Sequence, residues 1–282
     1  MSENDGEVGD AEDEMAKPIE QTERQRREIE TYNARAVAEW REAIDLDHYS
    51  HERFGPWNPY WRTVHYALDH YPPKSNKLLA YGCGAGALGL RLAHMGYQVK
   101  AFDISDQLIR NAQHLAEKYG LSDSISFSVQ SAENLEFESD AFDVVVGMNI
   151  LHHIDLTLAV PELKRVLRPG GSAIFKDSLQ TPFRDRLRKS WPVRALLPLG
   201  TKNRRTGEMY RPTADELPLG PKDIDLLEEH FSRVTVERFH VLTLLSKVVG
   251  NRPLMERCDW SLFRVLPFVR RLGDNVVIIL EK

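Results

Sequence analysis

Short apolar runs alternate with helical patterns from Lys77 to Lys176, and this rhythm restricts the chain to few folds. The apolar runs read KLLAY, QVKAF, SISFSV, FDVVVGM and GSAIFK, and helical patterns begin between them at Ala87, Asp106 and Leu156. Strands that alternate with helices form βαβ units, whose strands lie parallel in one sheet. Most of these runs are apolar along their length, as strands covered on both faces must be. The sequence therefore predicts an α/β fold with a doubly wound, mainly parallel sheet.

Further segments flank this core. The stretch 19–44 is charged with sparse apolar residues and predicts a helix, whereas the aromatic stretch 48–61 is broken by two prolines and predicts a loop or lid. A helix at 221–230 and the apolar runs RVTVERF and NVVIILEK complete a Rossmann-like sheet of seven strands. The predicted organisation is a disordered acidic tail at 1–18, an N-terminal helical lid at 19–73 and a binding domain at 74–282, with an insertion after strand five at 177–220 that caps the carboxyl edge of the sheet.

The composition is ordinary for a globular protein and argues against several functions. The 282 residues are 42% hydrophobic and carry a net charge of −5, so no basic excess points to nucleic acid. Cys83 and Cys258 have neither metal-ligand spacing nor the pattern of a disulfide framework, which favours a reducing compartment. No apolar run is long enough for a membrane span, and the acidic N-terminus is unlike a secretory signal. We expect a cytoplasmic protein without a metal, a nucleic-acid partner or stable membrane insertion; the oligomeric state is left open.

The stretch LLAYGCGAGALG, Leu78 to Gly89, has the pattern of a strand, a glycine turn and a helix. The first N–H groups of such a helix have no partner within it and attract an anion, and glycines let a ligand approach the backbone. Gly82, Gly84 and Ala87 fit a dinucleotide fingerprint, whereas Gly82, Gly84 and Gly86 fit the loop that binds S-adenosylmethionine (SAM). A glycine turn without a ligand is the third interpretation. The motifs that follow discriminate among the three.

The motifs SAENLEFESDAFDVVVGMNILHHI and LKRVLRPGG follow the glycine turn. Together with it they resemble the class I SAM-dependent methyltransferases, notably the branches similar to ubiquinone-biosynthesis and small-molecule methyltransferases. The resemblance covers roughly Lys77 to Lys176. It implies that S-adenosyl-L-methionine is the cofactor, that 74–282 is the methyltransferase domain, and that the acceptor is a small molecule. Whether oxygen, nitrogen or carbon receives the methyl group stays open.

The resemblance also implies roles for individual cofactor-binding residues. The loop of Gly82, Cys83, Gly84, Ala85 and Gly86 would cradle the methionine end of SAM. Asp103 would bind the ribose hydroxyls, although it could instead serve as a charge at a helix N-terminus. The remaining predicted contacts are Ile104 on the adenine face, Ala132 and Glu133 at the adenine edge, and Asn149 and Leu151 on the methionine side. Glu133 could equally be a solvated loop acid.

Ala80 departs from the family pattern. Many members carry Asp or Glu two residues before the first glycine, where the carboxylate helps to orient the methionine ammonium. An alanine cannot do this, so binding could be weaker by about 1–2 kcal/mol. A chain of this family that binds SAM without transferring its methyl group is therefore a rival hypothesis.

Methyl transfer needs no fixed catalytic signature, because the donor is already reactive and alignment is the main requirement. His152 and His153 are candidate bases because they follow the end of a strand, where α/β sheets bind ligands, and Asp177 ends the next strand. These three residues could instead be packing or turn residues. The acceptor pocket is predicted from aromatic residues in the irregular segments, namely Tyr49, Trp57, Tyr60, Trp191 and Tyr210.

Two further alternatives are disfavoured by the motifs. An NAD-dependent enzyme would share the glycine turn and Asp103 but not the later motifs. An RNA or protein methyltransferase is disfavoured because NILHH stands where an N-P-P-Y type of motif would follow the fourth strand, and because the charge gives no nucleic-acid footprint.

Overall fold

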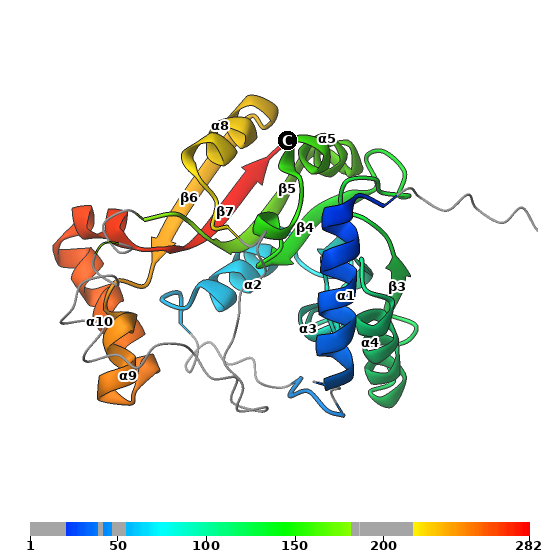
Figure 1. The fold of residues 1–282 in the computed structure, drawn as a ribbon, viewed down its shortest axis with the longest axis horizontal. Helices are drawn as coiled ribbons and strands as arrows, with labels where there is room; N and C mark the ends of the chain where they lie inside the picture. The colour runs from blue at the N-terminus through cyan, green and yellow to red at the C-terminus, as the bar shows by residue number, and fades with distance from the viewer. Residues whose placement is uncertain (1–20, 39–41, 47–54, 182–185, 187–216) are drawn as a thin grey trace, which may run out of the picture.

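The computed structural model describes residues 21–38, 42–46, 55–181, 186 and 217–282, and seven strands form one sheet within them (Figure 1). The strands are β1 Lys77–Tyr81, β2 Gln98–Asp103, β3 Ile125–Val129, β4 Phe142–Met148, β5 Leu167–Ser178, β6 Arg233–Phe239 and β7 Asn275–Glu281. The α-helices are α1 Glu23–Ala38, α2 Pro59–His70, α3 Ala87–His94, α4 Asp106–Lys118, α5 Leu156–Val166, α8 Pro221–His230, α9 Ser246–Val249 and α10 Arg252–Val265. The described residues also contain three 3-10 turns: η1 Leu151–His153, η2 Leu242–Leu245 and η3 Pro267–Leu272.

The strand order is β3-β2-β1-β4-β5-β7-β6. The five strands β1 to β5 pair in parallel, and β7 lies antiparallel between β5 and β6. This confirms the predicted seven-stranded, mainly parallel sheet. The order reverses between β1 and β4, and open α/β sheets bind ligands beyond the carboxyl ends of the strands at such a switch point.

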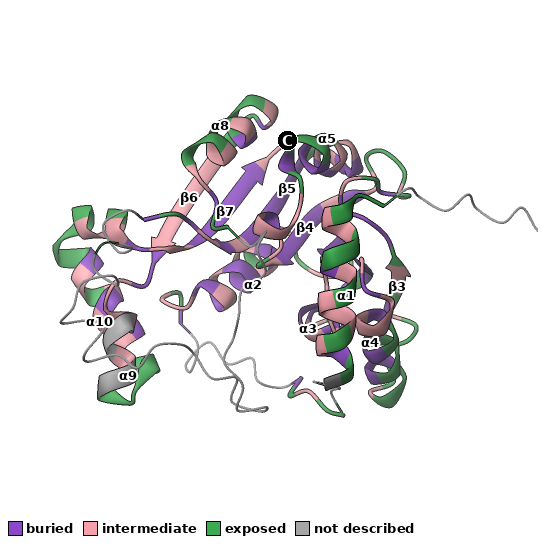
Figure 2. Ribbon diagram, viewed as in Figure 1, coloured by how far each residue is buried: buried purple, intermediate pink, exposed green. Residues whose placement is uncertain are grey.

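Helices cover both faces of the sheet, so its central strands are buried (Figure 2). Side chains alternate along each strand, and Leu78 and Ala80 of β1 therefore pack on one side while Leu79 and Tyr81 pack on the other. The first side is covered by α2, α3 and α4, and the second by α5 and α8. This packing explains why the strands are apolar along most of their length.

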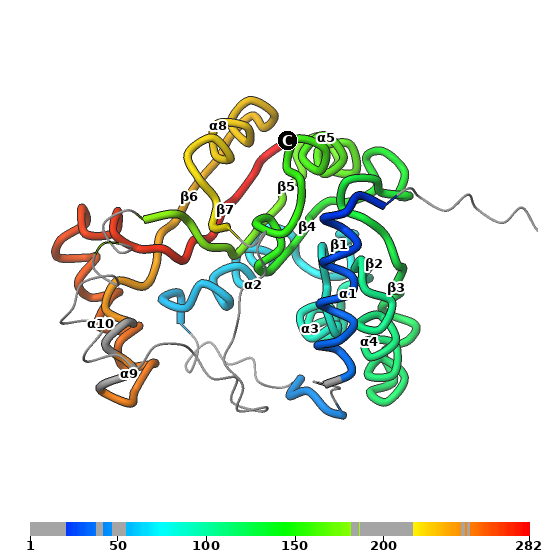
Figure 3. Tube along the Cα trace, in the orientation of Figure 1, coloured from blue at the N-terminus to red at the C-terminus, as the bar shows by residue number. Residues whose placement is uncertain are grey.

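The predicted lid at 19–73 contains two helices with different surroundings. Trp61, Val64 and Ala67 of α2 are buried in the core against the sheet, so this helix is part of the folded domain. In contrast, α1 lies beside α4 (Figure 3), where Asn33 donates a hydrogen bond to Asp106. The two helices therefore have different surroundings and do not form a single lid.

The ends of the predicted insertion meet at the end of β5. Leu179 pairs with Leu219, and the Gln180 N–H donates to the carbonyl of Leu219. The chain therefore leaves the sheet and returns at one point of its carboxyl edge. Most of the insertion, the tail 1–18 and the predicted acceptor residues Tyr49, Trp191 and Tyr210 lie outside the described residues.

Candidate functional site

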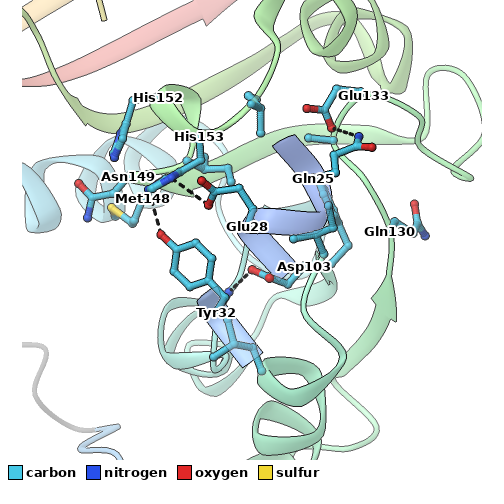
Figure 4. A pocket seen from close by; sticks show the side chains of 18 of the residues that line it. Gln25, Glu28, Tyr32, Asp103, Gln130, Glu133, Met148, Asn149, His152 and His153 are labelled. Atoms are coloured by element: carbon cyan, nitrogen blue, oxygen red, sulfur yellow. Dashed lines mark hydrogen bonds and ion pairs between the residues drawn. The ribbon is translucent and has the colours of Figure 1, made fainter. Parts of the chain in front are cut away.

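A cavity of about 620 Å³ lies at the carboxyl ends of β1, β2, β4 and β5 (Figure 4). This volume is within the range of about 300–1,000 Å³ that is typical of small-molecule sites. Among its lining residues are most of the predicted cofactor residues: Gly82, Gly84, Asp103, Ile104, Ala132, Glu133 and Asn149. The predicted bases His152 and His153 also line it, together with Lys176 and a row of residues from α1.

The glycine turn has a backbone that favours glycine at three positions. Gly82, Gly84 and Gly86 have φ of 60°, 54° and 80°, which is the left-handed region. A Cβ on Gly82 would lie 2.6 Å from the side chain of Ile150, whereas one on Gly84 would meet no atom within 4 Å. The space above Gly84 is therefore open to a ligand, and the turn leads directly into α3.

Asp103 fixes the glycine turn and the start of α4. Its carboxylate accepts hydrogen bonds from the N–H of Gly84 at 2.8 Å and of Ser105 at 3.1 Å. Burial raises the pKa of this carboxyl, and the N–H donors and the neighbouring His153 oppose that increase. Each carboxylate oxygen has two lone pairs, so Asp103 retains acceptor sites for a ribose diol.

At the predicted adenine edge, Glu133 is tied into its surroundings. It accepts hydrogen bonds from Ser131, from the Gln25 side chain at 3.2 Å and from the Asp155 N–H at 3.0 Å. Gln25 belongs to α1, and Figure 4 shows its side chain reaching toward Glu133. Glu133 therefore connects α1 to the loop after β3. A solvated loop acid, the alternative interpretation, would need none of these contacts.

His152 and Asp177 form a close pair at the ends of β4 and β5. The His152 Nδ1 lies 2.6 Å from the Asp177 Oδ1, and the side chain of Asp177 has no exposed surface. The second carboxylate oxygen accepts the Leu151 N–H at 2.9 Å. The short turn η1 is thereby held against β5, with His152 at the cavity wall.

His153 is contacted on both ring nitrogens by α1. Its Nε2 lies 3.0 Å from the Tyr32 hydroxyl, and its Nδ1 lies 3.3 Å from the Glu28 carboxylate (Figure 4). His152 and His153 are adjacent in sequence but have different surroundings. His152 lies at the edge of the sheet, and His153 lies beneath α1.

Asn149 and Lys176 form another polar contact at this edge, and the backbone of Asn149 is strained. Asn149 has a φ of 54°, which is uncommon for a residue other than glycine, and its N–H donates to the Lys176 carbonyl at 2.7 Å. The Lys176 ammonium donates back to the Asn149 side-chain oxygen, and burial lowers the pKa of this lysine. Leu151, another predicted contact, is buried in the core behind the cavity wall.

Sequence reasoning missed Lys176 and the α1 side chains Gln25, Glu28 and Tyr32. The α1 residues recur at intervals of three and four, which places them on one helix face. That spacing is a sequence signal for a shared face, but it does not indicate a binding site, because a polar helix face ordinarily faces water. Only the structure shows that Glu28 is buried beneath the helix.

Tyr60 and Ala80 line a separate cavity of about 210 Å³ on the other side of the glycine turn. The Tyr60 hydroxyl accepts a hydrogen bond of 2.7 Å from Arg91 there. Trp57 lies against Arg257 of α10, with the guanidinium carbon 5.3 Å from the ring centroid. The assignment of Trp57 and Tyr60 to the acceptor pocket stays a prediction.

Comparison with known proteins identifies the family. A methyltransferase domain profile matches residues 79–175. Residues 79–175 are a class I SAM-dependent methyltransferase domain. SAM is the methyl donor of the family, which favours it over NAD as the ligand of the glycine turn.

Two relatives differ in the atom that they methylate. The ubiquinone/menaquinone biosynthesis C-methyltransferase UbiE of Bartonella tribocorum is 29% identical over 181 residues, which are 60% of this chain and 67% of that protein. The ubiquinone biosynthesis O-methyltransferase of Xanthomonas oryzae pv. oryzae is 34% identical over 110 residues, which are 38% of this chain and 44% of that protein. The chain thus spans about two thirds of the first relative and less than half of the second.

The fold resembles solved methyltransferase structures. A geranyl diphosphate C-methyltransferase from Streptomyces coelicolor, solved with S-adenosyl-L-homocysteine, superposes with a TM-score of 0.57. It is 14% identical, and the match covers 92% of this chain and 98% of that one.

No helix in the described part of the chain is long and apolar enough to cross a membrane. Those residues also contain no cluster of three or more His, Cys, Asp or Glu side chains that could hold a metal ion.

Proposed function

We propose that this chain transfers the SAM methyl group to a small molecule whose nucleophilic atom must lose a proton, and that His152 takes that proton. The observation that carries the proposal is the 2.6 Å contact between His152 Nδ1 and the buried Asp177 carboxylate. A carboxylate accepts, so it favours the tautomer with the proton on Nδ1 and leaves the Nε2 lone pair as the base. Asp177 also stabilises the imidazolium that forms when the proton is taken.

Geometry favours His152 over His153 for this role. Both nitrogens of His153 have partners on α1, in Tyr32 and Glu28. His152 has one nitrogen held by Asp177 and lines the cavity. His153 is therefore better suited to hold α1 over the site than to accept a proton.

The residues present fit SAM at the other end of the cavity. The open space above Gly84 suits the close approach of a ligand, and Asp103 retains acceptor sites for the ribose. Ala132 and Glu133 would border the adenine, and Asn149 the methionine side. The bound sulfonium supplies an activated methyl group, so the chain must align the acceptor and exclude water. Helix α1 covers the cavity with Glu28 and Tyr32 and would therefore help to exclude water.

The experiment offers the protein SAM and a pool of cellular metabolites, and uses mass spectrometry to find a compound that gains the mass of one methylene group. His152→Gln retains an amide that can donate to Asp177 but cannot act as a base. We expect it to lower turnover by about 10²–10⁴-fold, the usual contribution of a general base. Its affinity for SAM should stay within threefold of the parent's. Unchanged turnover in this variant would exclude His152 as the base.

Ala80 supports a second candidate function, in which the chain binds SAM without transferring its methyl group. The missing carboxylate leaves the 210 Å³ cavity beside the glycine turn without an acid from β1. Under this alternative, calorimetry detects SAM binding, but no metabolite in the pool is methylated and no S-adenosylhomocysteine accumulates. Product formation would exclude it.

A further inference from the structure

The turn from α10 into η3 exposes four consecutive apolar residues, Val265, Leu266, Pro267 and Phe268. Val265 is 77% exposed and Phe268 is 67% exposed. Single exposed apolar residues are normal on a protein surface, but a run of three or four has a binding role when it is not a defect. We call the stretch Arg264–Arg271 the η3 rim; it lies beyond α10 at the left of Figures 1 and 2.

Around the η3 rim most of the basic side chains are exposed and the acidic side chains are buried. Arg257, Arg264 and Arg271 are exposed. Between residues 252 and 273 the acidic residues are Glu256 and Asp259, and both are buried. Asp259 accepts hydrogen bonds from the N–H groups of Val241 and Leu242, and Glu256 accepts from Asn58 and Arg252. The acids of residues 252–273 thus lie inward and most of the arginines outward, so the exposed charges of this segment are cationic on a chain of net charge −5.

The turn that carries the rim is held in place by Arg270. The guanidinium of Arg270 lies over the rings of Trp260 and Phe263, 5.6 Å from each centroid. Because this arginine and these rings pack against each other, Val265 and Phe268 are left outside the packed interior. The apolar run is therefore presented by a fixed turn.

The rim is at the same edge of the sheet as the cavity. Asn275, at the start of β7, pairs with Ser178 at the end of β5, and the Leu179 N–H donates to the Asp274 carbonyl at 2.7 Å. Ser178 itself lines the cavity, and η3 ends two residues before Asp274. A surface that contacts the rim would therefore lie along the edge of the sheet at which the cavity is found.

We propose that the η3 rim docks this chain on an anionic lipid membrane. Exposed arginines are attracted to anionic headgroups, and Val265, Leu266 and Phe268 can enter the interface between headgroups and acyl chains. Such binding is peripheral and needs no spanning helix. A second copy of the chain fits less well, because a two-fold contact across the rim would set arginines against arginines.

The test measures co-sedimentation of the full chain with lipid vesicles, in the absence of SAM and acceptor. Vesicles of phosphatidylcholine alone are compared with a roughly two-to-one mixture of phosphatidylcholine and phosphatidylglycerol. The parent should bind the mixed vesicles and not the neutral ones, and high salt should weaken the binding. Because no catalysis is measured, the result is independent of the proposed methyl transfer.

Two double variants separate the two contributions. Arg264→Gln with Arg271→Gln should lower the partition coefficient by about thirtyfold. Val265→Ser with Phe268→Ser should lower it at least tenfold through the loss of apolar insertion. The matched control is Leu158→Ser, an exposed apolar residue on α5 that is 53% accessible, and it should bind as the parent does.

The proposal is overturned if the parent does not bind the mixed vesicles, or if the double variants bind as well as Leu158→Ser. It is also overturned if analytical ultracentrifugation shows a dimer that the rim variants convert to a monomer, since a second copy would then cover the rim. Circular dichroism and thermal unfolding of each variant check that the fold is retained.

Discussion

Asp103 combines two tasks in one carboxylate. The N–H groups of Gly84 and Ser105 already donate to it, so the same side chain that would bind the ribose also shapes the glycine turn. Asp103→Asn keeps one acceptor oxygen and much of the volume but removes the charge. We expect SAM to bind more weakly by about 2–4 kcal/mol, the value of two charge-assisted hydrogen bonds. Calorimetry measures this, with the exposed Asp123→Asn as control; a change of less than threefold would show that Asp103 is not the ribose ligand.

The raised pKa of Asp103 predicts how SAM binding depends on pH. Burial favours the protonated form, so this carboxyl takes up a proton at a higher pH than an ordinary aspartate with a pKa of about 3.9. A protonated carboxyl loses acceptor capacity, and SAM affinity should therefore fall as the pH is lowered through that raised value. Affinity measured across a pH series should show this decrease in the parent and a smaller one in Asp103→Asn. An equal decrease in both proteins would assign the titration to another group.

Ala80 determines what the methionine end of SAM can contact. It is buried on β1 and borders the 210 Å³ cavity, whose wall also contains Tyr60, the hydroxyl of which accepts a hydrogen bond from Arg91. That cavity has room for a longer side chain, and a carboxylate could reach the methionine ammonium. Ala80→Glu should tighten SAM binding by about 1 kcal/mol, measured by calorimetry beside Ala80→Gln as an uncharged control. A large loss of affinity would mean that another residue already supplies this contact.

At the scale of elements, α1 is a polar helix held over the cofactor end of the cavity by specific hydrogen bonds. Gln25 reaches Glu133 and Ser131, and Tyr32 reaches His153. Tyr32→Phe and Gln25→Ala should each weaken SAM binding by about 1 kcal/mol through faster dissociation, because the covering helix opens more readily. Stopped-flow dissociation measures this. The control Arg27→Ala changes a half-exposed side chain on the same helix, and an equal effect there would point to general loss of helicity.

The sequence was most informative where local pattern and burial agree. The central strands β1, β4 and β5 were predictable because both faces are covered, and the glycine turn because left-handed backbone demands glycine. The surroundings of α2 could be predicted from its sequence, but those of α1 could not. An apolar stripe of Trp61, Val64 and Ala67 marks α2 as a core helix, but the buried contact of Glu28 with His153 depends on two segments 125 residues apart meeting in space.

At the scale of the whole molecule, the N-terminal and C-terminal parts of the chain meet at Glu256. This residue of α10 is 5% exposed and accepts from Asn58, the N-cap of α2, at 3.0 Å, and from Arg252 at 2.9 Å. His240, which follows β6 and has a φ of 66°, lies 3.5 Å from it. A single buried carboxylate therefore joins the helix that precedes β1 to the helix that precedes β7.

Removal of that carboxylate should loosen the connection between these helices. Glu256→Ala removes the carboxylate that accepts from the Asn58 amide and lies beside the buried His240, and taking the acceptor away from a buried polar contact costs about 1–3 kcal/mol. The Arg252 contact adds little, because its side chain is largely exposed. Urea unfolding should show a decrease of that size in the free energy of unfolding, against less than about 0.5 kcal/mol for the exposed Glu117→Ala. SAM affinity should change little, since Glu256 does not line the large cavity. Equal stability of the two variants would mean that the contacts of Glu256 do not hold α2 and α10 together.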